Sequence, residues 1–298
     1  MDIADFQDHI TIRGVHGRAV DCRHIPGTEN VAVVYFGGFG SHPWNPVADM
    51  FADYCRERGH SFTGFVYSGD RSIDGGQEYL KNFTVGGWRQ EAEAIWSHTA
   101  QQPGIDTIVA IGTSNGANFA TDLAIKHPGD AGGVVLTAPA FDIDKNLLPL
   151  LFMFDPDKEK SLRENGWFDL PVPSSCAGEL GLQARVTSEI IEDALRHRTF
   201  ADEHQVLYVP CPMVVVHSTD DNVVPFPIAQ ELVTQRIRCA TGTPELHTLT
   251  DAGHSYDQPH HIEFVGGHFE NVLQTAVREA RRPTSRRNSY ELHLQAAE

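Results

Sequence analysis

Residues 107–116 read Thr-Ile-Val-Ala-Ile-Gly-Thr-Ser-Asn-Gly, and this stretch decides the fold class. The apolar part predicts a buried strand over 107–111, and residues 115–126 predict a helix. Between them, Gly112-Thr-Ser114-Asn-Gly116 matches the pattern G-x-S-x-G, in which a sharp turn exposes a serine hydroxyl above a sheet. The pattern alone arises by chance in roughly one chain in ten of this length, so the strand–turn–helix context carries the prediction.

Two later loops supply the other groups that such a serine requires. A serine hydroxyl is a poor nucleophile until a histidine takes its proton and an acid orients that histidine. Asp221 follows a predicted strand at 213–216, and His254 follows one at 245–249. The order serine, acid, histidine is the one expected with this turn. We therefore predict a catalytic set of Ser114, Asp221 and His254.

Asp220 competes with Asp221 for the role of the acid. Asp221 lies four positions after His217 and four before Pro225, as in the pattern H-G-x-x-D-x-x-V-P that is common after this strand. Asp221 is therefore preferred, and Asp220 stays as the alternative. We expect His217 to pack at the end of its strand, whereas His254 stands in an Ala-Gly-His loop.

Acyl transfer also requires donors for the oxyanion that forms at the reacting carbonyl. The backbone N–H of Asn115, directly after the serine, is the first expected donor. The second should come from the glycine-rich loop after the apolar strand 31–36, from the amide of Phe39 or of Gly38. Phe39 is preferred, and a plain tight turn is the alternative for this loop.

Strands and helices alternate along most of the chain, which implies a mostly parallel sheet with helices on both faces. A hairpin is expected within 10–25, strands at 31–36, 62–67, 107–111, 134–136, 213–216 and 245–249, and helices at 44–58, 85–99 after an N-cap at Thr84, 115–126, 228–238 and 261–281.

Residues 141–209 interrupt this alternation. They lack a clear strand and are rich in helix formers, so we predict an inserted helical cap, with an ordinary long insertion as the alternative. The core would comprise 1–140 and 210–282, and 283–298 would be a polar, frayed tail. Aromatic side chains are mostly core. We nevertheless expect four aromatic side chains to form, together with the cap, a pocket for an apolar acyl or aryl group: Trp88, Phe152, Phe154 and Trp167.

The composition excludes several classes of partner. The 298 residues carry 23 Lys and Arg against 40 Asp and Glu, a formal net charge of −17. This charge argues against nucleic acid, against an anionic membrane surface and against anionic substrates. No apolar run approaches the roughly 20 residues of a membrane helix; the longest, 147–154, contains a proline.

The same composition bears on compartment and cofactors. Acidic residues (Asp2, Asp5, Asp8) and no basic segment open the chain, so no secretory or transit leader is expected. Five cysteines without a Cys-x-x-Cys pair predict a reduced, cytoplasmic protein.

No carboxylate or cysteine follows Pro259-His260-His261 at ligand spacing, so no metal site is predicted. Five arginines near the C-terminus suit a solvated helix end, with a phosphate or partner contact as the alternative: Arg278, Arg281, Arg282, Arg286 and Arg287.

Over residues 10–281 the chain resembles the α/β-hydrolase superfamily, and within it the small acyl-protein thioesterase and acyl-glucuronide esterase group. Four stretches carry the second likeness: Gly-Gly-Phe-Gly-Ser at 37–41, Tyr-Ser-Gly at 67–69, Thr-Val-Gly-Gly-Trp at 84–88 and Cys-Pro at 211–212. The sequence departs from that group at Asp70-Arg71, where a glycine-containing turn is usual, and at Asn115, where methionine is usual.

The resemblance implies an α/β-hydrolase fold and an acyl-enzyme on Ser114 that forms without metal or organic cofactor. The expected activity is hydrolysis of a neutral, largely apolar carboxylic ester, lactone or thioester. An acyltransferase or a C–C bond hydrolase could use the same residues, and a non-catalytic binding protein could keep the same fold. A homo-oligomer is left open.

Overall fold

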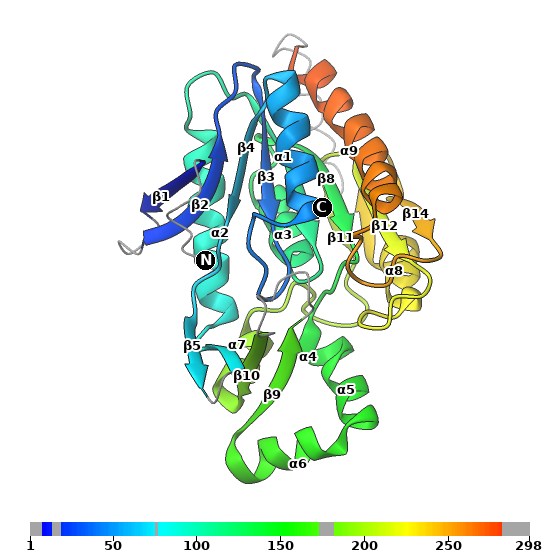
Figure 1. Ribbon diagram of the computed structural model, residues 1–298. Coiled ribbons are helices and arrows are strands. Elements are labelled where there is room, and N and C mark those ends of the chain that lie inside the picture. Colours follow the sequence, from blue (N-terminus) through cyan, green and yellow to red (C-terminus); the bar gives the residue numbers. More distant parts are fainter. Residues whose placement is uncertain (1–7, 14–18, 75–76, 173–181, 282–298) are drawn as a thin grey trace.

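The computed structural model describes residues 8–13, 19–74, 77–172 and 182–281. Its largest element is an eight-stranded sheet in the order β1-β2-β4-β3-β7-β8-β12-β14 (Figure 1). β1 pairs antiparallel with β2 and β2 with β4, and each later pair is parallel, so the mostly parallel sheet is confirmed. The strands are β1 (His9–Arg13), β2 (Ala19–Ile25), β3 (Val31–Phe36), β4 (Ser61–Phe65), β7 (Thr107–Thr113), β8 (Ala131–Thr137), β12 (Met213–Ser218) and β14 (Glu245–Leu249).

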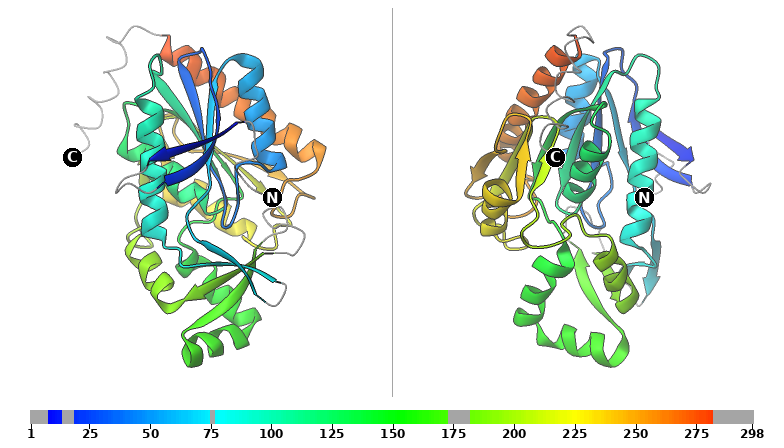
Figure 2. Two further views of the ribbon diagram at one scale, coloured as in Figure 1. Left: turned by 60° about the vertical axis from the view of Figure 1, so that its left-hand side comes forward. Right: turned by 180° about the vertical axis from the view of Figure 1, so that it is seen from behind.

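Helices cover both faces of this sheet, as predicted (Figure 2). All six residues of β3 are buried, which explains its continuous apolar sequence. The even-numbered residues of β3 join the core beneath α2 and α3, and the odd-numbered residues join the core beneath α1 and α9. Thr84 caps α2 as expected, because its hydroxyl accepts a hydrogen bond from Gly87 N. The helices are α1 (Pro46–Arg58), α2 (Val85–Ala100), α3 (Gly116–Lys126) and α9 (Pro259–Ala280).

The helix predicted over 228–238 is wrong at its C-terminal end. Helix α8 (Phe226–Glu231) continues as a π-helical turn, and β13 (Ile237–Cys239) then pairs in parallel with β11 (Leu207–Val209). Ile237 and Cys239 are buried while the residue between them is exposed. This alternation is typical of a strand, and it decides the local structure once β11 provides a partner.

A second, four-stranded sheet in the order β5-β6-β10-β9 lies at one end of the main sheet (Figure 1). Its members are β5 (Asp70–Asp74), β6 (Gln77–Lys81), β9 (Trp167–Val172) and β10 (Leu182–Thr187). The expectation that 141–209 lacks strands is therefore wrong, and β5 and β6 lie in a part of the chain where no strand was expected. The same region contains α4 (Ile143–Asn146), α5 (Leu148–Phe154), α6 (Pro156–Asn165) and α7 (Ser188–Arg196).

The strands of the second sheet join segments that are far apart in the sequence. β10 pairs antiparallel with β9 and parallel with β6, about 100 residues earlier in the chain. Buried and half-buried residues alternate along β10, a period-two pattern that in retrospect predicts a strand. We propose that 70–81 and 141–209 together form the cap, which would then be a mixed structure of strands and helices.

Several remaining predictions concern the termini and the cysteines. None of the helices within the described ranges is long and apolar enough to cross a membrane. Four cysteines are buried free thiols: Cys22, Cys55, Cys211 and Cys239. At the end of α9, Arg281 lies 3.3 Å from Glu29. The remaining residues of these predictions lie outside the described ranges: Asp2, Asp5, Cys176, Arg282, Arg286, Arg287 and the tail 283–298.

Candidate active site

Ser114 occupies the sharp turn between β7 and α3, as its sequence context predicts. Its φ of 52° lies in the left-handed region, which is strained for a residue with a side chain. A Cβ atom on Gly116 would lie 2.0 Å from the carbonyl oxygen of Phe36, and one on Gly112 would lie 2.7 Å from Ala117 Cα. Glycine is therefore required on both sides of the serine for the turn to form.

Histidine and carboxylate groups from two other loops meet this serine. His254 Nε2 lies 3.1 Å from Ser114 Oγ, and His254 Nδ1 lies 2.8 Å from Asp221 Oδ2. With a proton on Nδ1, the imidazole donates to Asp221 and its Nε2 accepts from the serine hydroxyl. The arrangement can therefore deprotonate Ser114 and stabilise the imidazolium that results.

The backbone of its own loop holds Asp221 in position. The side chain is fully buried, and its Oδ1 accepts hydrogen bonds of 2.8 Å from the N–H groups of Val223 and Val224. Oδ2 is then oriented towards His254. Buried carboxylate oxygens need such hydrogen-bond donors in place of water.

Asp220, on the same loop, and His217, at the end of β12, take other positions. Asp220 is exposed, and its Oδ1 accepts hydrogen bonds from Ser218 Oγ and from Gly253 N, so it links the loops that carry the acid and the histidine. His217 is buried at the end of β12, and its Nε2 donates to the carbonyl oxygen of Val224 at 2.9 Å. Burial lowers the pKa of His217, so its neutral form is favoured.

Gly38 and Asn115 lie on either side of the nucleophile. A Cβ on Gly38 would stand 3.1 Å from Ser114 Cβ and 3.7 Å from Ser114 Oγ, so the loop after β3 approaches the serine directly. Within the described part of the chain, the amides of Asn115 and Phe39 donate no hydrogen bond to another group. Both are thus available to an oxyanion. The Phe39 ring packs edge-on against Phe83 and Trp88, with centroids 5.2 and 5.6 Å away.

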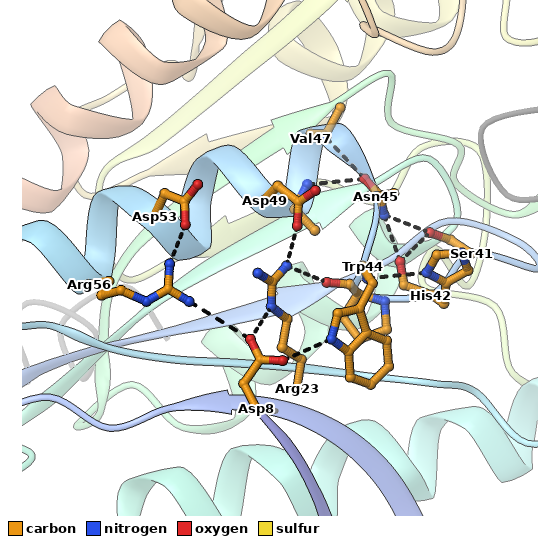
Figure 3. A network of polar contacts seen from close by, with 12 residues as sticks. Asp8, Arg23, Ser41, His42, Trp44, Asn45, Val47, Asp49, Asp53 and Arg56 are labelled. Carbon is orange, nitrogen blue, oxygen red and sulfur yellow. Dashed lines mark hydrogen bonds and ion pairs between the residues drawn. The ribbon is translucent and has the colours of Figure 1, made fainter. Parts of the chain in front are cut away.

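A buried arginine, Arg23, donates a hydrogen bond to the loop after β3 (Figure 3). The Arg23 side chain is 8% exposed; it donates to the carbonyl oxygen of Pro43 at 3.0 Å and pairs with Asp8 and Asp49. Trp44 Nε1 donates to Asp8 at 3.0 Å, which ties the loop to the same carboxylate. Burial raises the pKa of Asp8, but hydrogen bonds from Trp44 and Arg23 outweigh it, and the pKa lies below its usual value.

Asn118, in the first turn of α3, connects the nucleophile turn to both ends of 141–209. Its Nδ2 donates to the carbonyl oxygens of Asn115 at 3.0 Å and Ala140 at 2.8 Å. Its Oδ1 accepts from the hydroxyl of Thr199 at 3.1 Å. Asp142 accepts from the N–H of Thr199 at 2.8 Å, and burial raises the pKa of Asp142. No sequence motif marked these residues, because their partners other than Asn115 lie 22 to 81 positions away.

A cavity of about 610 Å³ opens onto Ser114 and His254. Part of its wall comes from α5, the residue before it and α7, and the apolar residues there include Leu147, Leu148, Leu151, Ile190 and Ile191. Of the side chains predicted for the pocket, Trp88 and Phe154 line it. Phe152 packs instead against Phe168, with ring centroids 5.6 Å apart.

Trp167, also predicted for the pocket, is not among the residues that line the cavity. It lies beneath the guanidinium of Arg185, which is 3.7 Å from the ring centroid. The sequence analysis did not predict the leucines of α5 as pocket residues. Their apolar run, 147–154, bears there only on the question of a membrane helix. Their role depends on how the cap folds over the serine, which local sequence does not encode.

Comparisons with known proteins agree with this fold. The family model described as serine aminopeptidase, S33, matches residues 28–165. A palmitoyl-protein thioesterase of Bos taurus, ABHD10, mitochondrial, is 27% identical over 197 residues, which are 65% of this chain and 58% of that protein. The chain spans about three fifths of the length of the curated relatives it matches.

Two solved structures are similar over most of the chain. The α/β-hydrolase domain-containing protein 10 from mouse is 19% identical with a TM-score of 0.67, over 89% of this chain and 98% of that one. A soluble variant of monoglyceride lipase from Saccharomyces cerevisiae, in complex with a substrate analogue, is 13% identical with a TM-score of 0.69. The match covers 93% of this chain and 97% of that one. At these identities the two structures establish the fold.

Proposed function

We propose that the chain, which has the fold of the α/β hydrolases, is a serine hydrolase of that superfamily and acts on carboxylic esters, including thioesters and lactones. The observation that carries the proposal is the hydrogen-bonded series Ser114, His254, Asp221 at the floor of an apolar cavity. A non-catalytic binding protein would have no need to keep these three groups at 3.1 and 2.8 Å.

The reaction would proceed in two steps. Ser114 Oγ attacks the carbonyl carbon while His254 Nε2 takes its proton, and the oxyanion accepts hydrogen bonds from the amides of Asn115 and Phe39 or Gly38. The imidazolium of His254 then protonates the leaving oxygen or sulfur, and an acyl-enzyme remains. A water molecule, deprotonated by His254, attacks this ester and releases the acid. Asp221 holds the imidazole in the required tautomer throughout.

The cavity favours an apolar acyl group. Its cap side is lined mostly by apolar side chains from α5 and α7. Asp144 of α4 also lines this side, and it is paired with Arg198 at 2.5 Å. Two other polar lining residues, Asn222 and Asp257, come from the loops that carry Asp221 and His254. We therefore propose that the acyl chain extends beneath the cap and the leaving group faces these polar loops. The net charge of −17 disfavours an anionic substrate.

Chain-length preference tests this proposal. Each buried methylene contributes about 0.8 kcal/mol, so four of them could favour an octanoyl over a butyryl thioester by up to about 200-fold in kcat/KM. We expect a preference of at least about tenfold, measured with a thiol reagent on matched acyl thioesters. Butyryl turnover equal to or above octanoyl turnover would contradict an apolar acyl site.

A bulky residue on α5 should reverse this preference. Leu151 lines the cavity, so Leu151→Trp would occupy the space of the acyl chain and lower octanoyl turnover about tenfold, with little change for butyryl. Met153 is on the same helix but 63% exposed and is absent from the lining, so Met153→Trp is the matched control. Product analysis with added alcohols distinguishes hydrolysis from acyl transfer in the same assay.

Arg23 is expected to act as a positioning residue for the oxyanion donors. In Arg23→Met the loop loses the donor to Pro43, and a small displacement of the Phe39 amide should lower kcat about tenfold with KM nearly unchanged. Arg56 is half exposed and lies 3.9 Å from Asp8, so Arg56→Met is the control and should retain kcat. A lower melting temperature with full kcat in Arg23→Met would mean a structural role alone.

A further inference from the structure

Outside the cavity, a carboxylate and two imidazoles lie close together where α9 begins. The preceding loop carries His254 and is called the histidine loop. Asp251 follows β14, and His260 and His261 lie in the first turn of α9. Asp251 Oδ2 lies 3.0 Å from His260 Nε2, and Asp251 Oδ1 lies 3.4 Å from His261 Nε2. One ligand atom of each residue lies within 4.8 Å of the others. The carboxylate precedes the histidines in sequence, so ligand spacing after the histidines does not reveal it.

His261 is buried, with 1% of its surface exposed, yet in the described part of the structure its ring nitrogens have no hydrogen-bond partner. Buried polar atoms in native proteins nearly always have a partner. The Nε2 atom of His261 lies 3.4 Å from Asp251 Oδ1, but this contact does not satisfy hydrogen-bond geometry.

We propose that Asp251, His260 and His261 bind a divalent transition metal ion, and zinc fits this set of ligands best. Two imidazoles and one carboxylate are preferred ligands of zinc. Ligands about 2.0–2.1 Å from a tetrahedral ion lie about 3.4 Å from one another, close to the separations from Asp251 to the two histidines. Asp251 and His260 are each 60% exposed, so they can adjust and a water molecule can take the fourth position.

The ion would take no part in acyl transfer and would act on the loop instead. Asp251 begins the segment that carries His254, which is also held by hydrogen bonds from Ala252 N to Ser218 and from Gly253 N to Asp220. A metal ion shared by Asp251 and α9 adds a third attachment. Binding should therefore stabilise the folded chain, because the ion binds the folded site and not the separated ligands.

The test uses the full chain after treatment with a chelator, with Co²⁺ and Zn²⁺ as probes. We expect one Co²⁺ per chain with visible d–d absorption. Zn²⁺ at a hundredfold excess over Kd should raise Tm by about 5 °C. Asp251→Asn and His260→Gln should each weaken Co²⁺ binding at least about tenfold. The matched control is His247→Gln, because His247 pairs with Glu245 at 3.1 Å elsewhere on the surface.

The readouts are absorption, stoichiometry and Tm, so they do not depend on the proposed hydrolysis. Asp251 and His260 are exposed, and an unchanged Tm without metal will verify that both variants fold. Absence of Co²⁺ binding in the wild type would overturn the site. Unchanged binding in either variant, or loss of binding in His247→Gln alone, would overturn this assignment of ligands.

Discussion

Ser114→Ala is expected to abolish labelling by a fluorophosphonate probe and to lower kcat for an octanoyl thioester by about 10⁶-fold. The probe reacts with an activated serine hydroxyl, and Ser114 Oγ is the hydroxyl that lies 3.1 Å from His254 Nε2. Alanine removes the nucleophile, so no acyl-enzyme can form. The labelled protein is detected on a gel, and the residual rate is measured at high enzyme concentration.

Ser255 provides the control for this variant. It lines the same cavity and follows His254, so a probe that reacted with any accessible serine there could also label it. Ser255→Ala should keep the label. A normal label on Ser114→Ala would mean that another residue is the nucleophile. A folded wild type that takes no label would contradict an activated serine.

The main sheet and its helices could be predicted because their signals are local. The buried run Val31–Phe36 and the glycine-flanked Ser114 each define their structure within about ten residues. In a parallel sheet the loops after successive strands meet at one edge, so the order of Ser114, Asp221 and His254 was enough to bring them together as a hypothesis. The structure places all three within hydrogen-bond distance.

What the sequence did not reveal depends on partners distant in the chain. β10 forms a strand because β9 and β6 flank it, and the alternation along β10 was too short to stand out among helix formers. Phe152 and Trp167 do not line the cavity and pack instead against Phe168 and Arg185. No pattern in a single sequence specifies such cap contacts.

Asp221→Asn is expected to lower kcat by about 10⁴-fold near neutral pH. Asparagine is similar in shape, so the loop should keep its hydrogen bonds from Val223 and Val224 to the side-chain oxygen. Its amide, however, would face His254 Nδ1 with an N–H donor. The imidazole would then carry its proton on Nε2, where it cannot accept the proton of Ser114, and the imidazolium would lose its counter-charge. Single-turnover kinetics of Asp221→Asn and of the wild type would measure the effect.

Asp220→Asn decides between the two neighbouring carboxylates. Asp220 is exposed, and its hydrogen bonds reach Ser218 and Gly253 rather than His254. Removing its charge should therefore lower kcat less than about tenfold, through a small shift of the histidine loop. Because an exposed charge is screened by solvent while a buried one is not, the two effects should differ by about three orders of magnitude. The reverse order of effects would assign the acid to Asp220 and would require the loop to rearrange before reaction.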